Sequence, residues 1–148
     1  MIAVNKTLYE QDYHLWLSQT VEKLRSQQFS EIDWENLIEE LEALGRSERQ
    51  QLRNRLNTLI EHLLKRLYVN LPNDFNGWER TIREQRKQII WLLSDSPSLK
   101  SIWGESFDTA WLFAIRDVAK DYPGYQFPAK WQFSSDPDEL LYREYWVD

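Results

Sequence analysis

Two ionisable side chains in the middle of the chain, Glu40 and His62, have the types needed for acid/base chemistry. Histidine titrates closer to neutral pH than any other side chain, and a carboxylate beside it can exchange a proton with the ring. Both lie on the flanks of apolar helical stripes, and Arg55 shares the flank of His62. In an antiparallel hairpin of the two stripes, Glu40 would reach His62 or Arg55. A structural hydrogen bond or ion pair is the favoured interpretation, and a catalytic pair is the alternative.

The same residues make an incomplete metal site. One histidine and one carboxylate supply at most half of the usual ligands, and the other histidine, His14, lies on the outer part of its helix. The chain has no cysteine, and the Glu-x-x-His and His-Glu-x-x-His patterns of helical metal sites are missing. No Ser-His-Asp set or glycine-rich nucleotide loop is recognisable. We therefore expect no metal and no cofactor.

A second candidate is Arg86, which projects from an apolar stripe between Ile82 and Ile89. An unpaired guanidinium is costly to bury, so we expect Arg86 to meet a carboxylate, with Glu40 or Asp12 favoured. The alternative is an internal pocket in which Arg86 binds an anionic ligand. A helix N-terminus after the sequence 45–47, which contains Arg46, could also hold an anion, but a plain turn is the favoured interpretation there.

Helical periodicity organises the whole chain, and no strand alternation is apparent. Asp33 is expected to cap the second helix, Gly45 to end it, and Ser47 to start the next. A turn or two is expected at 97–103, after Asp95-Ser96-Pro97. The expected helices cover about 7–26, 34–44, 47–69, 76–93, 106–121 and 140–145.

The fold class follows from these helices and from the C-terminal composition. From about residue 123 to 148 the chain is irregular but rich in aromatic residues, and disordered tails are usually poor in them. We predict one all-α domain over 1–148, a compact bundle of five to six helices with this tail packed on it.

Charge is distributed unevenly along the chain. Residues 1–45 carry 3 basic and 9 acidic groups, residues 46–100 carry 11 and 6, and residues 101–148 carry 4 and 9. A basic middle segment packed against acidic flanks is the favoured interpretation, and an exposed basic face for phosphates or an acidic partner is the alternative. The net charge of −6 disfavours nucleic-acid binding through 46–66.

The chain has no apolar run of the roughly 20 residues that a membrane span requires. Its first six residues lack the charged front and apolar middle of a signal peptide. We therefore expect a soluble, cytoplasmic protein that does not enter a membrane.

Several blocks of sequence, in order, resemble a bacterial, mainly cyanobacterial family known only as domain-of-unknown-function family twenty-nine. They are YEQDYHLW (9–16), NLIEELE (36–42), GRSE (45–48), HLLK (62–65), WERTI (78–82) leading to Arg86, DSPSL (95–99), and Phe127-Pro128 with Trp131. The resemblance implies a helical fold and a bacterial, cytoplasmic setting, but no established activity or cofactor. Its polar motif positions fall on Asp12, Asn36, Glu39, Glu40, Arg46, His62, Lys65, Trp78 and Arg86.

Three functional hypotheses remain open. The first is a non-enzymatic helical module that binds an unidentified protein partner or self-associates through exposed aromatic residues and complementary charged regions. Trp91 lies on an outward helix face, where it would contact a partner or be covered by the aromatic tail. The second is a small enzyme, for example a hydrolase, in which Glu40 and His62 act beside Arg55 or Arg86. The third, nucleic-acid binding, is least favoured. The candidate binding residues are Asp12, Asn36, Arg46, Arg55, Lys65, Trp78 and Arg86.

Overall fold

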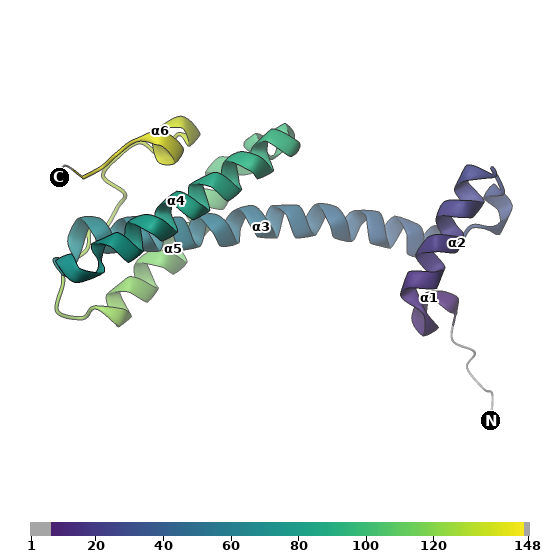
Figure 1. Ribbon diagram of the computed structural model, residues 1–148, viewed down its shortest axis with the longest axis horizontal. Helices are drawn as coiled ribbons and strands as arrows, with labels where there is room; N and C mark the ends of the chain where they lie inside the picture. Colours follow the sequence, from purple (N-terminus) through teal and green to yellow (C-terminus); the bar gives the residue numbers. More distant parts are fainter. Residues whose placement is uncertain (1–6, 147–148) are drawn as a thin grey trace, which may run out of the picture. The chain divides into compact units, whose positions relative to one another are not determined.

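Much of the chain consists of leucine, glutamate, arginine and glutamine, which favour helix formation, and helices dominate the structure. The structure is a computed structural model that describes residues 7–146 and contains no strand in that range. Six α-helices follow one another (Figure 1). They are α1 (Leu8–Gln11), α2 (Tyr13–Arg25), α3 (Trp34–Tyr68), α4 (Pro72–Asp95), α5 (Trp103–Asp121) and α6 (Pro137–Tyr142), with two 3-10 helices at Phe29–Glu31 and Pro97–Ile102. The all-α prediction and the turn expected at 97–103 are confirmed. The signal-peptide question falls on residues 1–6, outside the described part.

The predicted hairpin around Gly45 is wrong, because α3 runs without interruption for 35 residues (Figure 1). A glycine inside a helix costs only about 1 kcal/mol relative to alanine. The good helix formers on both sides outweigh that cost, and no described glycine adopts a positive φ. Arg46 also pairs with Glu42 one turn earlier. Asp33 caps the helix as expected, accepting a hydrogen bond from the Asn36 backbone N–H at 3.3 Å.

The start of α4 also differs from the prediction. The helix begins at Pro72 rather than near Asn76-Gly77, with proline in its first turn. Proline suits that position because the first backbone N–H groups of a helix have no intrahelical acceptor. Gly77 therefore lies inside a helix, and a methyl group added there would meet nothing within 4 Å.

Replacing Gly77 with alanine is expected to stabilise the protein by about 0.5–1 kcal/mol, because alanine loses less backbone freedom on helix formation. Urea unfolding followed by circular dichroism measures the change. Gly104→Ala, in the first turn of α5 and also with open space around it, is the matched control and should gain less. A loss of stability in Gly77→Ala would contradict the early start of α4.

The predicted first helix is divided at Asp12. Thr7 caps α1 by accepting a hydrogen bond from the Glu10 backbone N–H, and α1 then ends at Asp12. The Asp12 carboxylate accepts a hydrogen bond of 3.0 Å from the Leu15 N–H and so caps α2. Asp12, a candidate binding residue in the sequence, is thus a helix cap.

The contacts divide the chain into two compact units, an N-terminal unit of residues 1–47 and a C-terminal unit of residues 48–148. Each is described separately below. The single domain over 1–148 stays a prediction.

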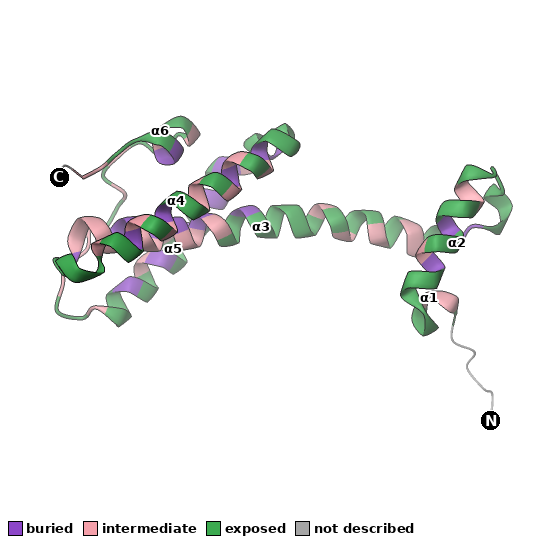
Figure 2. Cartoon of the chain, viewed as in Figure 1, coloured by how far each residue is buried: buried purple, intermediate pink, exposed green. Residues whose placement is uncertain are grey.

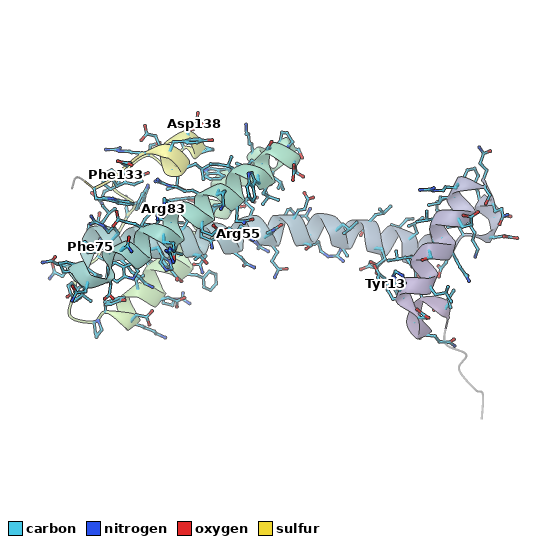
Figure 3. The ribbon with its side chains drawn as sticks, viewed as in Figure 1. Tyr13, Arg55, Phe75, Arg83, Phe133 and Asp138 are labelled. Carbon is cyan, nitrogen blue, oxygen red and sulfur yellow. The ribbon has the colours of Figure 1, made fainter. Side chains whose placement is uncertain are left out.

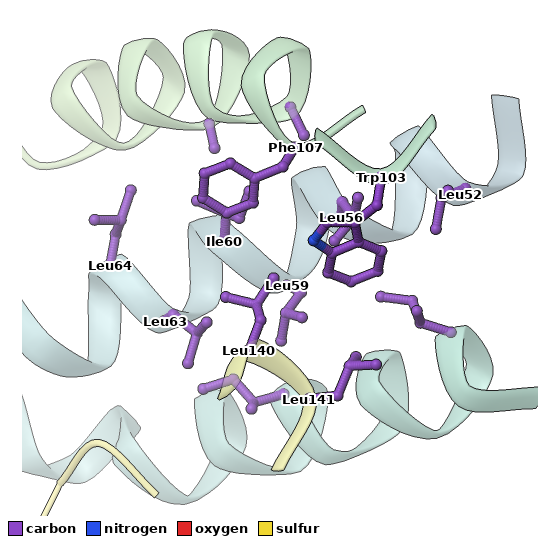
Figure 4. Close-up of a cluster of buried hydrophobic side chains, with 14 of the residues drawn as sticks. Leu52, Leu56, Leu59, Ile60, Leu63, Leu64, Trp103, Phe107, Leu140 and Leu141 are labelled. Carbon is purple, nitrogen blue, oxygen red and sulfur yellow. The ribbon is translucent and has the colours of Figure 1, made fainter. Parts of the chain in front are cut away.

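The C-terminal unit has a continuous apolar core. Six α3 side chains are fully buried, and they pack with α4, α5 and α6 residues in one cluster (Figure 4). Phe107, Leu140 and Leu141 bring α5 and the short α6 into this cluster. The α3 members are Leu52, Leu56, Leu59, Ile60, Leu63 and Leu64.

The aromatic C-terminal segment packs on this core, as predicted. Trp131 lies edge-on to Trp111 of α5, with ring centroids 6.2 Å apart, and it also contacts Phe133 and Tyr145. The indole N–H of Trp103 donates a 2.7 Å hydrogen bond to the Ser135 carbonyl. These contacts hold an irregular segment whose backbone would otherwise be free.

Candidate functional site

Glu40 joins the three helices of the N-terminal unit. Its carboxylate accepts hydrogen bonds from the hydroxyls of Tyr9 on α1 and Tyr13 on α2, the second at 2.5 Å (Figure 3 labels Tyr13). Beside it, the Tyr9 ring stands edge-on to the rings of Tyr13 and Trp16, which stack on each other. The sequence did not predict that Glu40 would accept hydrogen bonds from these two hydroxyls. The i, i+4 spacing of Tyr9 and Tyr13 did indicate that both side chains would lie on the same face of a helix.

Hydrogen bonding sets the protonation of this cluster. The bond to Glu40, followed by desolvation, raises the pKa of Tyr9 to about 12 and also raises that of Tyr13. The bonds from Tyr13 and Tyr9 lower the pKa of Glu40. The stabilising contribution of Glu40 is therefore present above pH 4.5 and lost as pH falls through its lowered pKa. The contribution of Tyr9 is present below pH 10 and lost as pH rises through about 12.

Replacing Glu40 with glutamine should return the pKa of Tyr9 toward 10, because an amide oxygen stabilises the hydroxyl less than a carboxylate does. NMR titration of isotope-labelled tyrosine measures this shift. Glu42→Gln, two residues along the same helix, serves as the control and should leave the titration of Tyr9 unchanged. A Tyr9 pKa that stays near 12 in Glu40→Gln would contradict the assigned cause.

The other candidates in the N-terminal unit make local contacts. The Asn36 side-chain amide donates a 2.7 Å hydrogen bond to Asp33. Arg46 pairs with Glu39 at 2.9 Å and with Glu42 at 4.0 Å, and all three side chains are more than half exposed. Exposed pairs of this kind contribute little to stability.

His62 lies in the C-terminal unit, half-buried on α3. Its Nδ1 is 2.8 Å from the Thr58 carbonyl oxygen, which can only accept, so Nδ1 carries the proton. Desolvation lowers the pKa of His62 below 6.5, and nearby Lys65 acts in the same direction. Because α3 is continuous, the hairpin that was expected to bring Glu40 to His62 is not formed. A catalytic role for either residue stays a prediction without that geometry.

Lowering the pH through the His62 pKa should destabilise the folded protein. The folded state favours the neutral ring. The contribution of His62 to the free energy of unfolding is therefore fully present above pH 6.5 and is lost as the pH falls through its lowered pKa. We expect His62→Gln to unfold with a weaker dependence on pH than the wild type just below pH 6.5, measured by urea denaturation. His14→Gln, at an exposed position of α2, is the control. An equal pH dependence in His62→Gln and wild type would contradict the effect.

The remaining candidates of the C-terminal unit do not meet at one point either. Arg55 donates a 3.3 Å hydrogen bond to the side chain of Gln85. The Lys65 ammonium lies 6.0 Å from the centroid of the Tyr122 ring, and the same ring stands edge-on to the buried Trp78.

The carboxylate partner predicted for Arg86 is wrong. Its guanidinium donates hydrogen bonds to the Leu140 carbonyl at 3.0 Å and to the Arg143 carbonyl at 2.6 Å. Tyr145 lies against it, 5.8 Å from the ring centroid, and burial lowers the pKa of Arg86. Backbone carbonyls thus satisfy a half-buried cation that we expected Glu40 or Asp12 to neutralise. Sequence spacing gives no sign of such acceptors, because every residue carries one.

The C-terminal unit also has a groove of about 270 Å³ between α3 and α5, lined by Gln50, Arg53, Asn54, Asn57, Thr109, Ala110, Phe113 and Asp117. Neither His62 nor Arg86 lines it. Among residues 7–146, no group of three or more histidine or carboxylate side chains is arranged to hold a metal ion. The polar candidates of the C-terminal unit therefore make their contacts at separate points of the fold.

The most unusual surface lies on the first part of α3. Trp34, Ile38, Leu41 and Leu44 are 46%, 51%, 59% and 64% exposed, and we refer to these four residues as the α3 stripe. Helical periodicity places three of them, Trp34, Leu41 and Leu44, on an apolar stripe of the kind that usually faces a core, but the structure leaves all three exposed. Figure 2 shows α3 largely exposed in this part and buried further along. The stripe continues the helical face that Leu52 and Leu56 bury in the C-terminal unit. The sequence indicates its apolar character but not its exposure.

The N-terminal unit has few buried apolar side chains compared with the apolar side chains that it exposes. Within its described part, Trp16 and Ile32 are the buried apolar residues, whereas eight large apolar side chains are exposed. The described part of the C-terminal unit exposes five, including Trp91, which the aromatic tail leaves uncovered. Contiguous exposed apolar residues of this kind mark interaction surfaces. The remaining exposed residues of the N-terminal unit are Tyr13, Leu15, Val21 and Phe29.

Fold and surface together define an all-helical protein with an uncovered apolar helix face. No helix within residues 7–146 combines the length and apolarity of a membrane span. The family model described as Domain of unknown function DUF29 matches residues 8–146. The chain therefore belongs to this family, in agreement with the resemblance seen in the sequence. No curated protein and no solved structure matches the chain.

Proposed function

We propose that this protein is a helical protein-interaction module and that its docking surface is the α3 stripe. The main support is the exposure of four large apolar side chains at helical spacing on one face of α3. Burying such side chains against a partner yields about 25 cal/mol per Å² of apolar area removed from water. An amphipathic helix face with anchors at this spacing is a common recognition element.

The small core of the N-terminal unit supports the same proposal. Units with so few buried apolar residues are marginally stable unless another component adds buried surface. A partner bound to the α3 stripe would supply that additional buried surface and stabilise the N-terminal unit by mass action. The polar candidates are engaged in contacts within the fold, which favours the module over the enzyme. The cytoplasmic location and the identity of the partner stay predictions.

Site-specific photo-crosslinking in cells tests the proposal. A photoreactive amino acid at Leu41 is expected to capture another polypeptide. The same group at Leu112 of α5, a leucine of nearly equal exposure (61% against 59%), should capture less. Leu41→Glu combined with a photoreactive residue at Leu44 should abolish capture. Equal capture from Leu41 and Leu112, or none from either, would overturn the proposal.

A further inference from the structure

A cavity lined by aromatic rings lies in the C-terminal unit. Its volume is about 290 Å³, and it is open to solvent. It is formed by α5 and the segment of residues 130–135, which belong to the same compact unit. We refer to its aromatic side chains as the aromatic cluster, and they are Phe107, Trp111, Trp131 and Phe133.

The fold holds these rings in place without a ligand. Phe107 and Trp111 are four residues apart and therefore lie on the same face of α5. Trp131 comes from the irregular segment, and its indole N–H donates a 3.2 Å hydrogen bond to the Ser134 carbonyl. The hydrogen bond from the indole of Trp103 fastens the same segment to α5. A site that is already ordered loses less conformational entropy when a ligand binds.

The rings of the aromatic cluster meet at steep angles. The plane of Trp131 is inclined by 60° to that of Phe107, by 61° to that of Trp111 and by 65° to that of Phe133. The corresponding ring centroids are 6.5, 6.2 and 5.3 Å apart. A parallel stack would leave no space among its members, whereas rings inclined in this way form the walls of a concave site.

Two of the rings are available to a cation. The face of an aromatic ring carries negative charge density, and tryptophan attracts cations more strongly than tyrosine or phenylalanine does. The Arg143 guanidinium already lies over Phe133, 5.0 Å from the ring centroid. Within residues 7–146, no lysine or arginine side chain lies over Trp111 or Trp131. These two indoles are therefore the rings that a bound cation would contact.

One charge of each sign lines the same cavity. Asp108 and Lys130 are both exposed, and in the described part of the chain neither side chain makes an ion pair or a hydrogen bond. Asp108 lies three residues before Trp111 and is its neighbour on the surface of α5. Lys130 directly precedes Trp131. The site thus combines aromatic faces, a carboxylate and an ammonium group, all of which can contact a ligand.

From this combination we infer that the cavity binds a small zwitterion with a trimethylammonium group and a carboxylate, the chemistry of glycine betaine. A trimethylammonium group is less strongly hydrated than an ammonium group, so it loses less on entering an aromatic site. Asp108 adds to the attraction of the indoles for this group, and Lys130 pairs with the ligand carboxylate. The inference goes beyond the proposed interaction function and is independent of it, because the α3 stripe lies in the other unit.

The charges favour a zwitterion over two simpler ligands. Choline has no anionic group, so Lys130 would remain unpaired beside a second cation. An uncharged apolar ligand would use the rings of the aromatic cluster but neither Asp108 nor Lys130. A ligand with both charges satisfies both side chains at once.

Titration of the intact chain with glycine betaine, followed by the NMR signals of the tryptophan indoles, tests the site. The signals of Trp111 and Trp131 should shift and saturate. The signal of Trp91, an exposed tryptophan of α4, is the internal control and should not move. The absence of any saturable shift at Trp111 and Trp131 would overturn the inference.

Comparison of ligands tests the chemistry that the site recognises. In tert-butylacetate a carbon atom replaces the ammonium nitrogen of glycine betaine, so the shape and the carboxylate are kept while the positive charge is lost. We expect it to bind about tenfold more weakly or less tightly still. Equal binding of the two would overturn the role of the cation. Tighter binding of phosphocholine, or of a peptide that contains trimethyl-lysine, would overturn the assignment to a small carboxylate ligand.

A variant of the aromatic cluster tests the contact with the cation. Trp111→Leu should weaken the binding of glycine betaine by about tenfold or more. Phe113→Leu, at an exposed aromatic position of the same helix outside the cavity, is the matched control and should leave binding unchanged. Circular dichroism of both variants checks that the helices remain formed. Equal affinity of Trp111→Leu and wild type would overturn the inference.

Variants of the two exposed charges test the rest of the site without altering the core. Asp108→Asn should weaken the binding of both glycine betaine and choline by about threefold or more. Lys130→Gln should weaken glycine betaine by a similar factor but not choline, because only the former has a carboxylate. Lys120→Gln, at an exposed position of α5, is the control. Unchanged binding of glycine betaine in both Asp108→Asn and Lys130→Gln would overturn the assignment of a zwitterion.

Discussion

Replacing Arg86 with methionine is expected to lower the free energy of unfolding by about 3 kcal/mol. Hydrogen bonds from a charged donor contribute roughly 1.5–3 kcal/mol each, and Arg86 makes two, to the carbonyls of Leu140 and Arg143. Partial exposure of the group reduces the total below the sum. Methionine keeps much of the apolar stem, so the loss reports mainly the polar contacts. Urea denaturation at neutral pH measures it.

Arg83→Met is the matched control for this prediction, because Arg83 lies one turn earlier on α4 and is exposed (Figure 3 labels it). A change within about 0.5 kcal/mol is expected there. The Arg86 variant should also become easier to cleave by protease between residues 123 and 146, because the guanidinium fastens that segment to α4. Equal stability of the two variants would show that these carbonyl contacts contribute little.

Replacing Leu59 with alanine should cost about 3 kcal/mol or more. Leu59 is fully buried on α3 among side chains of α4, α5 and α6, and truncation there leaves a cavity that close-packed neighbours fill only partly. Thermal and urea unfolding both measure the loss. Leu112→Ala, at an exposed position of α5, removes the same atoms from the surface and should change stability by less than about 0.5 kcal/mol. A similar small effect at Leu59 would contradict the assignment of the core.

Helical periodicity predicted the elements well where caps and apolar spacing agreed. Asp33 caps α3 as expected and Thr7 caps α1. The α3 residues Leu52, Leu56, Leu59, Ile60 and Leu63, which recur at helical spacing, are buried. The errors occur at glycines. Gly45 and Gly77 were interpreted as boundaries, yet both lie inside helices, because the cost of one glycine is small beside the propensity of its neighbours.

The error at Gly45 determined the error at the candidate site. With a hairpin, Glu40 and His62 would have faced each other, whereas one continuous helix gives each its own surroundings. Local spacing placed Glu40 on the correct flank but could not identify Tyr9 and Tyr13 as its partners, since that contact depends on how α1 and α2 fold back. The exposure of Leu41 and Leu44 depends likewise on tertiary contacts that periodicity does not reveal.

The position of α6 has a consequence for synthesis on the ribosome. Leu140 and Leu141 are buried in the core of the C-terminal unit, yet they leave the exit tunnel after all of α3, α4 and α5. Until they emerge, the nascent α3, α4 and α5 expose the apolar side chains that α6 later covers. The core of this unit is therefore completed only after α6 has emerged, and a nascent-chain-binding chaperone would have its longest opportunity just before residue 140 appears.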